Sequence, residues 1–130
     1  MATHKIRLTF EGSGVSDTRL IETENTGVAL IDGETIADSE TDYQINFDLD
    51  VSACTSFYLV SDQDITLETN AVDATGGNTL ALIADEPYIW HTSSLDSFLL
   101  DTDVTTTYWT NASGSSATVY CVALFDATPA

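Results

Sequence analysis

Apolar and polar residues alternate with a period of two along most of this chain, which is the pattern of β-strands with one buried face. In residues 4–10, Ile6, Leu8 and Phe10 fall on one face and polar residues fall on the other. Eight further segments show this alternation, or a short apolar run rich in Thr, Val, Ile and aromatic residues, which favour strands. These segments are residues 27–31, 43–51, 56–61, 64–70, 78–84, 86–92, 104–111 and 117–125. The pattern therefore predicts about eight or nine short strands.

Clusters of Gly, Asn and Asp separate these segments and predict tight turns. The sequence IDGET predicts a hairpin with Asp32-Gly33 at its tip, because Asp-Gly pairs favour two-residue turns between strands. Pro87 predicts an edge strand, because proline has no N–H to donate to a neighbour. Residues 92–102 are a candidate for a helical turn, but no segment has the length and spacing of a secure helix. We expect an all-β fold: a single-domain antiparallel β-sandwich, jelly-roll-like, with about eight or nine strands.

The length and apolar content of the chain fit a single domain. It has 130 residues, of which 43% are hydrophobic, enough to build a core. No composition shift or linker divides it. We therefore expect one β-sandwich domain over residues 1–130, with a short tail at residues 126–130.

Charge is distributed very unevenly. The chain has 21 acidic residues and only three basic ones, Lys5, Arg7 and Arg19, so its net charge is −18. Because Lys and Arg bind phosphate groups, this composition excludes most nucleic-acid binding and argues against docking on an anionic membrane. No apolar run approaches the ~20 residues of a membrane span, and the first residues lack the apolar segment of a signal peptide. The acidity has two interpretations: a means of solubility or adaptation to a salty medium, and a role on a basic partner surface.

The chain offers few groups for catalysis. The two available bases, His4 and His91, have no nucleophile turn beside them. We interpret His4 as a residue on the polar face of its strand and His91 as a surface or packed residue. Two His and two Cys spread along the chain do not make a zinc site, and no phosphate-binding glycine motif appears. A glycosidase-like carboxylate pair stays open, but chance pairs are expected among so many acids. We expect no enzyme activity and no cofactor.

Asp62 and Asp64, in the segment LVSDQDITLETN, form the best candidate for a metal site. Calcium prefers such oxygen ligands, but the match to a calcium-binding loop ends after these two residues. The alternative is a polar turn at residues 61–64, in which Asp and Ser side chains bond nearby backbone N–H groups. We expect this turn and no metal, and a structural calcium site between loops stays the alternative.

Cys54 and Cys121 are too few for a disulfide scaffold. A free buried thiol is expected for Cys121, which lies inside an apolar strand. A single bridge between the two cysteines is the alternative.

Aromatic residues raise the question of a sugar-binding platform. Trp90 and Trp109, with Tyr58, Tyr88 and Tyr108, could stack on a carbohydrate. Each Trp lies close to a Tyr in its strand, so we expect the two to alternate between faces and one of each pair to join the core. The sequence NASGSS after Trp109 fits a glycosylation sequon, but we interpret it as a hairpin loop.

Four motifs in the C-terminal two-thirds of the chain resemble a group of small proteins encoded among the structural genes of tailed bacteriophages and prophages. In order, these are a strand entering a D-x-D turn and a T-L-x-T-N strand, an apolar-Pro-aromatic strand with Trp, a TNASG turn with a final apolar strand, and a D-x-T-P tail. Here they are residues 59–70, 87–91, 110–114 with 117–125, and 126–129. These are turn and strand signatures, so the resemblance carries over no functional residues.

The resemblance implies a virion component that is made in the host cytoplasm and located on the capsid surface. A capsid decoration (cement) protein is the natural role, with the major capsid protein and further copies of itself, as a homotrimer or other homo-oligomer, as partners. We expect Lys5, Arg7 and Arg19 to contact an acidic capsid surface or a neighbour's acidic loop; the alternative is that they only relieve local acid repulsion. The competing function is a carbohydrate- or surface-binding module on a tail appendage, with Trp90 and Trp109 as surface anchors.

Overall fold

The computed structural model describes residues 1–128, which contain ten β-strands, one short 3-10 helix η1 (Val51–Ala53) and no α-helix. Every strand pairing is antiparallel. The strands are β1 (Ala2–Gly12), β2 (Val15–Asn25), β3 (Gly27–Ile36), β4 (Tyr43–Ile45), β5 (Cys54–Ser61), β6 (Ile65–Thr69), β7 (Thr79–Leu82), β8 (Tyr88–His91), β9 (Thr107–Thr110) and β10 (Ala117–Phe125). The expected all-β fold is confirmed.

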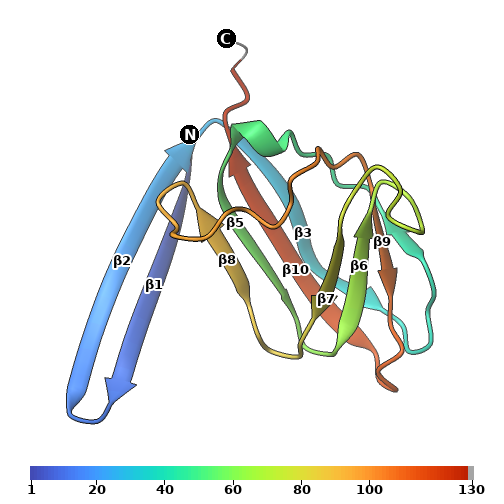
Figure 1. Cartoon of the computed structure of the whole chain (residues 1–130), viewed down its shortest axis with the longest axis horizontal. Coiled ribbons are helices and arrows are strands. Elements are labelled where there is room, and N and C mark those ends of the chain that lie inside the picture. Colours follow the sequence, from blue (N-terminus) through green and yellow to red (C-terminus); the bar gives the residue numbers. More distant parts are fainter. Residues whose placement is uncertain (129–130) are drawn as a thin grey trace.

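Eight of the strands form two four-stranded sheets, with the orders β3-β10-β5-β8 and β4-β9-β6-β7 (Figure 1). Among these eight, only β6 and β7 follow one another within the same sheet, and every other connection crosses between the sheets. This is the strand order of a jelly roll, so the predicted antiparallel sandwich with jelly-roll character is confirmed. Strand β8, which follows Pro87, is an edge strand as expected. Strands β1 and β2 pair only with each other.

The hydrophobic core lies between the two sheets. Phe57 and Leu59 enter it from β5, and Leu67 and Trp109 enter it from β6 and β9 of the opposite sheet. All four are at most 2% exposed, whereas Tyr58, Thr66 and Tyr108, which alternate with them along the strands, are only partly buried. Burial of such side chains stabilises the fold by about 1.5–3 kcal/mol each. The period-two pattern of the sequence is thus the pattern of this core.

The predicted hairpin at Asp32-Gly33 is wrong. Strand β3 runs through both residues and pairs with β10 over its whole length. Gly33 is an extra residue in this pairing, between Asp32 opposite Tyr120 and Glu34 opposite Val119, and its φ is +67°. A β-bulge with a residue in this left-handed conformation favours glycine, just as a tight hairpin turn does. The local signal was therefore correct about the backbone and wrong about the turn.

Three other expectations differ from the structure. Residues 43–51 contain a strand of only three residues, β4, although Phe47 and Leu49 remain buried on alternate positions. Residues 92–102 form turns and bends without a helical segment. Strand β2 lies outside all predicted strands, because both of its faces are largely exposed and its sequence does not alternate regularly.

Candidate functional site

The β1–β2 hairpin, here called the arm (residues 2–25), projects from the sandwich, here called the body (residues 26–128) (Figure 1). Its strands pair without interruption from Ala2 opposite Asn25 to Gly12 opposite Val15. Eleven residues per strand give it a length of about 35 Å. Every residue from position 7 to position 20 is exposed. The arm is therefore attached to the body only near its base.

One side of the arm, here called its apolar side, faces the body. Residues that pair directly across two strands share a face, which places five large apolar residues on this side. They are Ile6, Leu8, Phe10, Val15 and Ile21. Ile6 lines a pocket of about 250 Å³ together with Tyr58 and Val122 of the body. Beyond it the contact with the body fades, and Leu8 and Phe10 are 48% and 64% exposed. The predicted alternation in residues 4–10 is confirmed.

Polar contacts fasten the base of the arm to β5. His4 Nδ1 lies 3.0 Å from Ser56 Oγ, and Asn25 Nδ2 donates a hydrogen bond of 3.2 Å to Thr55 Oγ1. Leu124 of β10 is fully buried but stands outside the core cluster, because it shares the face of Ser56 that the base of the arm covers. The expectation that His4 lies on the polar face of its strand is wrong. It lies on the apolar side, and burial lowers its pKa.

The junction between arm and body is short. Only Thr26 separates β2 from β3, and its Oγ1 accepts a hydrogen bond of 2.9 Å from the backbone N–H of Ala127. A side chain at Gly27 would collide with the ring of Phe125. The described part of the predicted tail, residues 126–128, thus helps to hold the junction, and the last two residues of that tail lie outside the described residues. This close packing fixes the direction in which the arm leaves the body.

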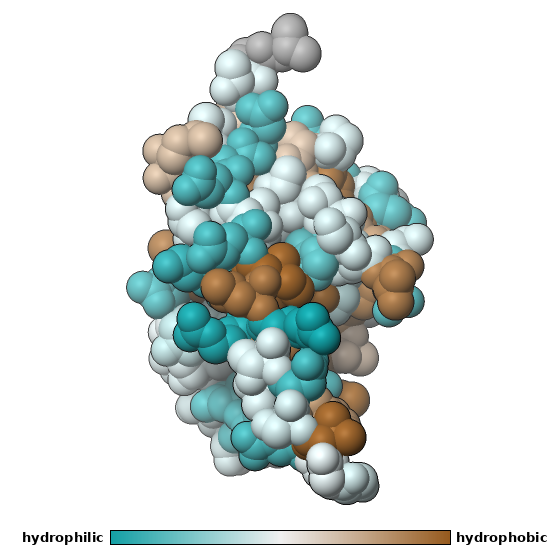
Figure 2. Space-filling model, turned by 90° about the vertical axis from the view of Figure 1, so that its left-hand side faces the viewer, coloured by the Kyte–Doolittle hydropathy of each residue, from teal (hydrophilic) through white to brown (hydrophobic). Residues whose placement is uncertain are grey.

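The sheet β3-β10-β5-β8 has an outer face, turned away from the core, that is also apolar. A row of directly paired residues crosses all four of its strands: Leu30, Val122, Tyr58 and Ile89. Val28, Leu30 and Tyr120 on this face remain 46%, 56% and 42% exposed. Figure 2 views the molecule from the side of the arm, which lies in front of this sheet, and shows apolar side chains gathered between polar ones on that side. This surface was not predicted from the sequence, although apolar residues on both faces of β3, β5 and β10 were a signal for it.

All three predicted contact residues lie on the arm, but on different sides. Lys5 and Arg7 lie on the side away from the body, and Arg19 lies on the apolar side opposite Leu8. Lys5 Nζ is 3.9 Å from Glu22 Oε1, and Arg19 Nε is 2.9 Å from Asp17 Oδ2. Arg7 makes no ion pair within residues 1–128. Exposed pairs of this kind contribute little to stability, so these cations can also serve a partner.

The arm and the body differ sharply in charge. Four of the 21 acidic residues lie in residues 1–25 together with all three basic ones, which gives this segment a net charge of −1. The other 17 acidic residues lie in residues 26–130, which contain no Lys or Arg. An approaching acidic surface is therefore repelled by the body and not by the arm.

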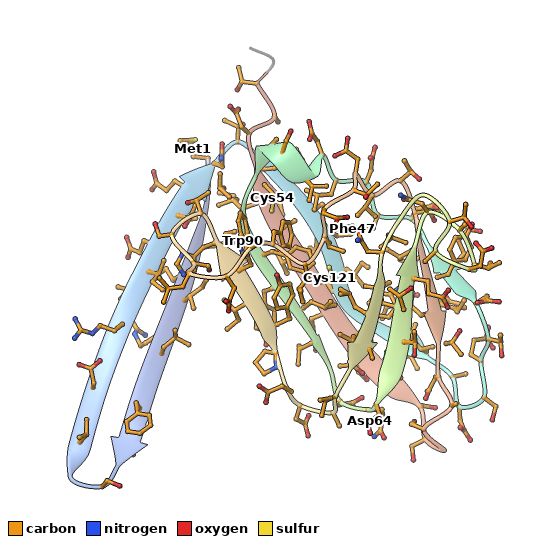
Figure 3. The ribbon with its side chains drawn as sticks, in the orientation of Figure 1. Met1, Phe47, Cys54, Asp64, Trp90 and Cys121 are labelled. Carbon is orange, nitrogen blue, oxygen red and sulfur yellow. The ribbon has the colours of Figure 1, made fainter. Side chains whose placement is uncertain are left out.

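The two carboxylates of the D-x-D segment serve the fold. Asp62 Oδ1 accepts a hydrogen bond of 2.8 Å from the backbone N–H of Thr118, and Asp64 Oδ1 accepts one of 2.8 Å from that of Ala84. Ser61 Oγ accepts a hydrogen bond of 3.1 Å from the N–H of Gln63. The predicted polar turn at residues 61–64 is confirmed, but it joins strands of different sheets and its carboxylates bond distant segments. Asp64 lies at the end of the sandwich opposite Met1 (Figure 3), and residues 1–128 contain no group of three potential metal ligands.

The two tryptophans are not equivalent. Trp109 is fully buried and its Nε1 donates a hydrogen bond of 2.9 Å to Thr107 Oγ1, so the expectation of a surface anchor there is wrong. Trp90 is half-buried and stacks on Phe98 at 4.5 Å between ring centres. It lines an open groove of about 390 Å³ with Leu8 of the arm. Tyr88 is two residues from Trp90 and packs on the same side, contrary to the expected alternation in this pair.

Cys54 and Cys121 are free and buried in the interior (Figure 3). In the pairing of β5 with β10, Cys54 stands opposite Phe125, four residues from Cys121. This offset corresponds to about 13 Å along the strand, beyond the reach of a disulfide. Burial raises the pKa of both thiols, that of Cys54 to about 11, so both stay protonated at neutral pH.

Asn111 of the candidate sequon is fully buried. Its Nδ2 donates hydrogen bonds to the carbonyl oxygens of Ile36, Ala37 and Ser115, and its Oδ1 accepts one from the N–H of Ser113. The side chain thus organises the connection between β9 and β10, which lie in different sheets and form no hairpin.

Comparisons with known proteins gave no match: no family model matches the chain, and no curated protein and no solved structure matches it. Within residues 1–128 no helix has the length and apolarity to cross a membrane.

Proposed function

We propose that this protein is a non-enzymatic structural component of a bacteriophage particle, a capsid decoration (cement) protein that binds the outer capsid surface through its arm. The observation that carries the proposal is the arm itself: a hairpin about 35 Å long that stands out from a jelly roll and holds every cation of the chain. The motif resemblance to proteins of tailed phages supports the choice of the capsid as the partner.

The division of labour between body and arm fits this role. A decoration protein needs a stable scaffold and an exposed contact surface, and jelly rolls are common in viral capsid proteins. The acidic body would keep the free protein soluble before docking, because strong net charge of one sign opposes aggregation. The nearly neutral arm would then make the first contact with an acidic capsid surface. Lys5 and Arg7 point away from the body and are placed for that contact.

The test is co-sedimentation of the purified protein with capsids that lack it. The double variant Lys5→Gln/Arg7→Gln removes two exposed cations of the arm. Each contact of this kind contributes up to about 1 kcal/mol, so the dissociation constant is expected to rise about tenfold. Its dependence on salt should become weaker as well.

A matched control changes the net charge equally but far from the arm. Gln44→Glu/Asn46→Asp alters two exposed positions at β4 and should leave binding nearly unchanged. Failure of the wild type to bind capsids would contradict the proposal. Equal weakening in both double variants would show that net charge matters and that the arm does not.

The groove beside Trp90 supports a second candidate, a carbohydrate- or surface-binding module on a tail appendage. It is open, and its lining combines Trp90 with His91, Asp96 and two serines. Stacking on Phe98 occupies one face of the Trp90 ring, and Trp90 Nε1 donates to the Asp96 carbonyl, so only part of the indole is free for a sugar. Glycan-array binding that is lost in Trp90→Leu, with the fold intact, would favour this function over the first.

A further inference from the structure

We infer that the apolar side of the arm packs on the exposed part of the outer face of a second copy of this chain. The inference goes beyond capsid binding, because it concerns contacts between copies and needs no capsid. It rests on three features: two matching apolar surfaces, a contact between them within one chain, and one complementary pair of charges.

The two surfaces are left uncovered in the single chain. Phe10 and Val15 on the arm are 64% and 53% exposed, and Leu30 and Val28 on the outer face are 56% and 46% exposed. The arm leaves the body at a junction of one residue and diverges from its own sheet toward its tip (Figure 1). Its outer half therefore does not cover the outer face of its own chain. Exposed apolar surfaces of this kind are typical of protein contacts.

The base of the arm already shows that these surfaces fit each other. There the apolar side lies on the outer face, His4 meets Ser56, and Leu124 is fully buried beneath the contact. The uncovered surfaces continue the same arm and the same sheet. In a pair of copies, the arm of each copy covers the exposed outer face of the other. Such an exchange is self-complementary, as contacts between identical subunits require.

Charge favours a second copy that contacts through the arm. The body carries 17 acidic residues without a single Lys or Arg, so two bodies repel each other, while the arm is nearly neutral. The apolar side of the arm holds Arg19, which is paired in register with Leu8 and forms an exposed ion pair with Asp17 of the same side. The outer face holds an exposed acid, Asp32, two residues from Leu30 and opposite Tyr120. Arg19 of one copy and Asp32 of the other are thus the charges that the contact would bring together.

The first experiment is sedimentation equilibrium of the purified chain over a range of concentrations. We expect the mass to rise above the 14.0 kDa of a single chain as concentration increases. Phe10→Ser on the arm and Leu30→Ser on the outer face should each raise the dissociation constant about tenfold or more, because each removes a large apolar contact. Val72→Ser is the matched control. The Val72 side chain is 52% exposed, a fraction similar to the 56% of Leu30, but it lies in the loop after β6. This substitution should leave association unchanged.

The second experiment exchanges the charges. Arg19→Asp and Asp32→Arg should each weaken association, because each places like charges in contact. Mixing the two variants should restore it, since a mixed pair contains one native contact and one reversed contact and has the same total charge as a wild-type pair. A contact within one chain could not be restored by mixing.

A wild type that stays at the mass of a single chain at every concentration would overturn the inference. So would association that Phe10→Ser and Leu30→Ser weaken no more than Val72→Ser does, or a mixture that associates no better than the two charge variants alone. Because capsids are absent from these measurements, none of these results bears on the proposed capsid binding.

Discussion

The body and the arm share an alternation of apolar and polar residues with a period of two, but they bury the apolar residues to very different extents. In β5 of the body, Phe57 and Leu59 point between two sheets and are 1% and 0% exposed. In β1 of the arm, Leu8 and Phe10 have the same spacing and are 48% and 64% exposed. The pattern therefore states which residues share a face, and it does not state what covers that face.

The comparison also concerns stability. The body stacks two sheets around a closed core, whereas the arm has a single layer of two strands. A two-stranded hairpin alone is marginally stable in water, because it buries little apolar surface. The order of the arm therefore depends on its base, its cross-strand pairs and whatever covers its apolar side. If the comparison is correct, substitutions should have large effects on folding in the body and small ones in the arm.

The largest effect is expected at Trp109. Trp109→Ala removes the largest fully buried side chain and should lower the free energy of unfolding by about 3–5 kcal/mol. Urea unfolding followed by circular dichroism measures the change. Because total stabilities of domains are of similar size, Trp109→Phe serves as the milder variant, with an expected loss of about 1–2 kcal/mol. A loss below 0.5 kcal/mol for either variant, on the order of a surface substitution, would contradict the place of Trp109 in the core.

A smaller loss is expected at Asn111. Asn111→Ala removes the side-chain donor to the buried carbonyl oxygen of Ile36 and the acceptor of the Ser113 N–H, whereas the carbonyl oxygens of Ala37 and Ser115 keep a second donor. The free energy of unfolding should fall by about 2–3 kcal/mol, the cost of unsatisfied buried polar groups. Asn46→Ala, at an exposed position, is the control and should stay within about 0.5 kcal/mol of the wild type. Equal effects at the two positions would exclude a structural role for the Asn111 side chain.

Most strands of the body could be predicted from the sequence because their alternating apolar residues enter one shared core. The alternation in residues 64–70 and 117–125 matches β6 and β10 closely. The total number of such segments along the chain predicted the sandwich. Prediction failed where distant partners decide the outcome. An Asp-Gly pair is equally suited to a hairpin and to a bulge, and only pairing with β10, more than 80 residues away, distinguishes the two at Gly33.

The candidate site was harder to predict for the same reason. The three cations were correctly singled out, and pairing of β1 with β2 places all of them on the arm. The arm itself was not predicted, because β2 has Leu20 and Ile21 adjacent and covers no core. The exposed outer face was not predicted either, because apolar residues on both sides of a strand predict burial on both sides. Here the second side, at Leu30 and Tyr120, is left exposed.

The attachment of the arm should depend on pH through His4. Burial lowers the pKa of His4 in the folded protein below its ordinary value of 6.5, so the unfolded or detached form binds a proton more readily. The contribution of this contact is therefore complete above pH 6.5 and is lost as pH falls toward the lowered pKa. Hydrogen exchange of the amides of His4 and Ile6, measured from about pH 7.5 to about pH 5.5 and corrected for intrinsic rates, should show falling protection. His4→Gln should remove most of this dependence, and unchanged protection in the wild type would contradict it.

The smallest effect on folding is expected at Phe10, which tests the difference in burial between the arm and the body most directly. Phe10→Ser removes a large apolar side chain, as Trp109→Ala does, but this side chain is 64% exposed and touches no core. In dilute solution, where copies are separated, the free energy of unfolding should change by less than about 0.5 kcal/mol. The same substitution is expected to weaken association between copies strongly, so a single variant separates the two uses of an apolar residue. Phe10→Ser unfolding measured in dilute solution therefore decides the matter: a loss comparable to that of Asn111→Ala would mean that the arm already buries Phe10 on its own body.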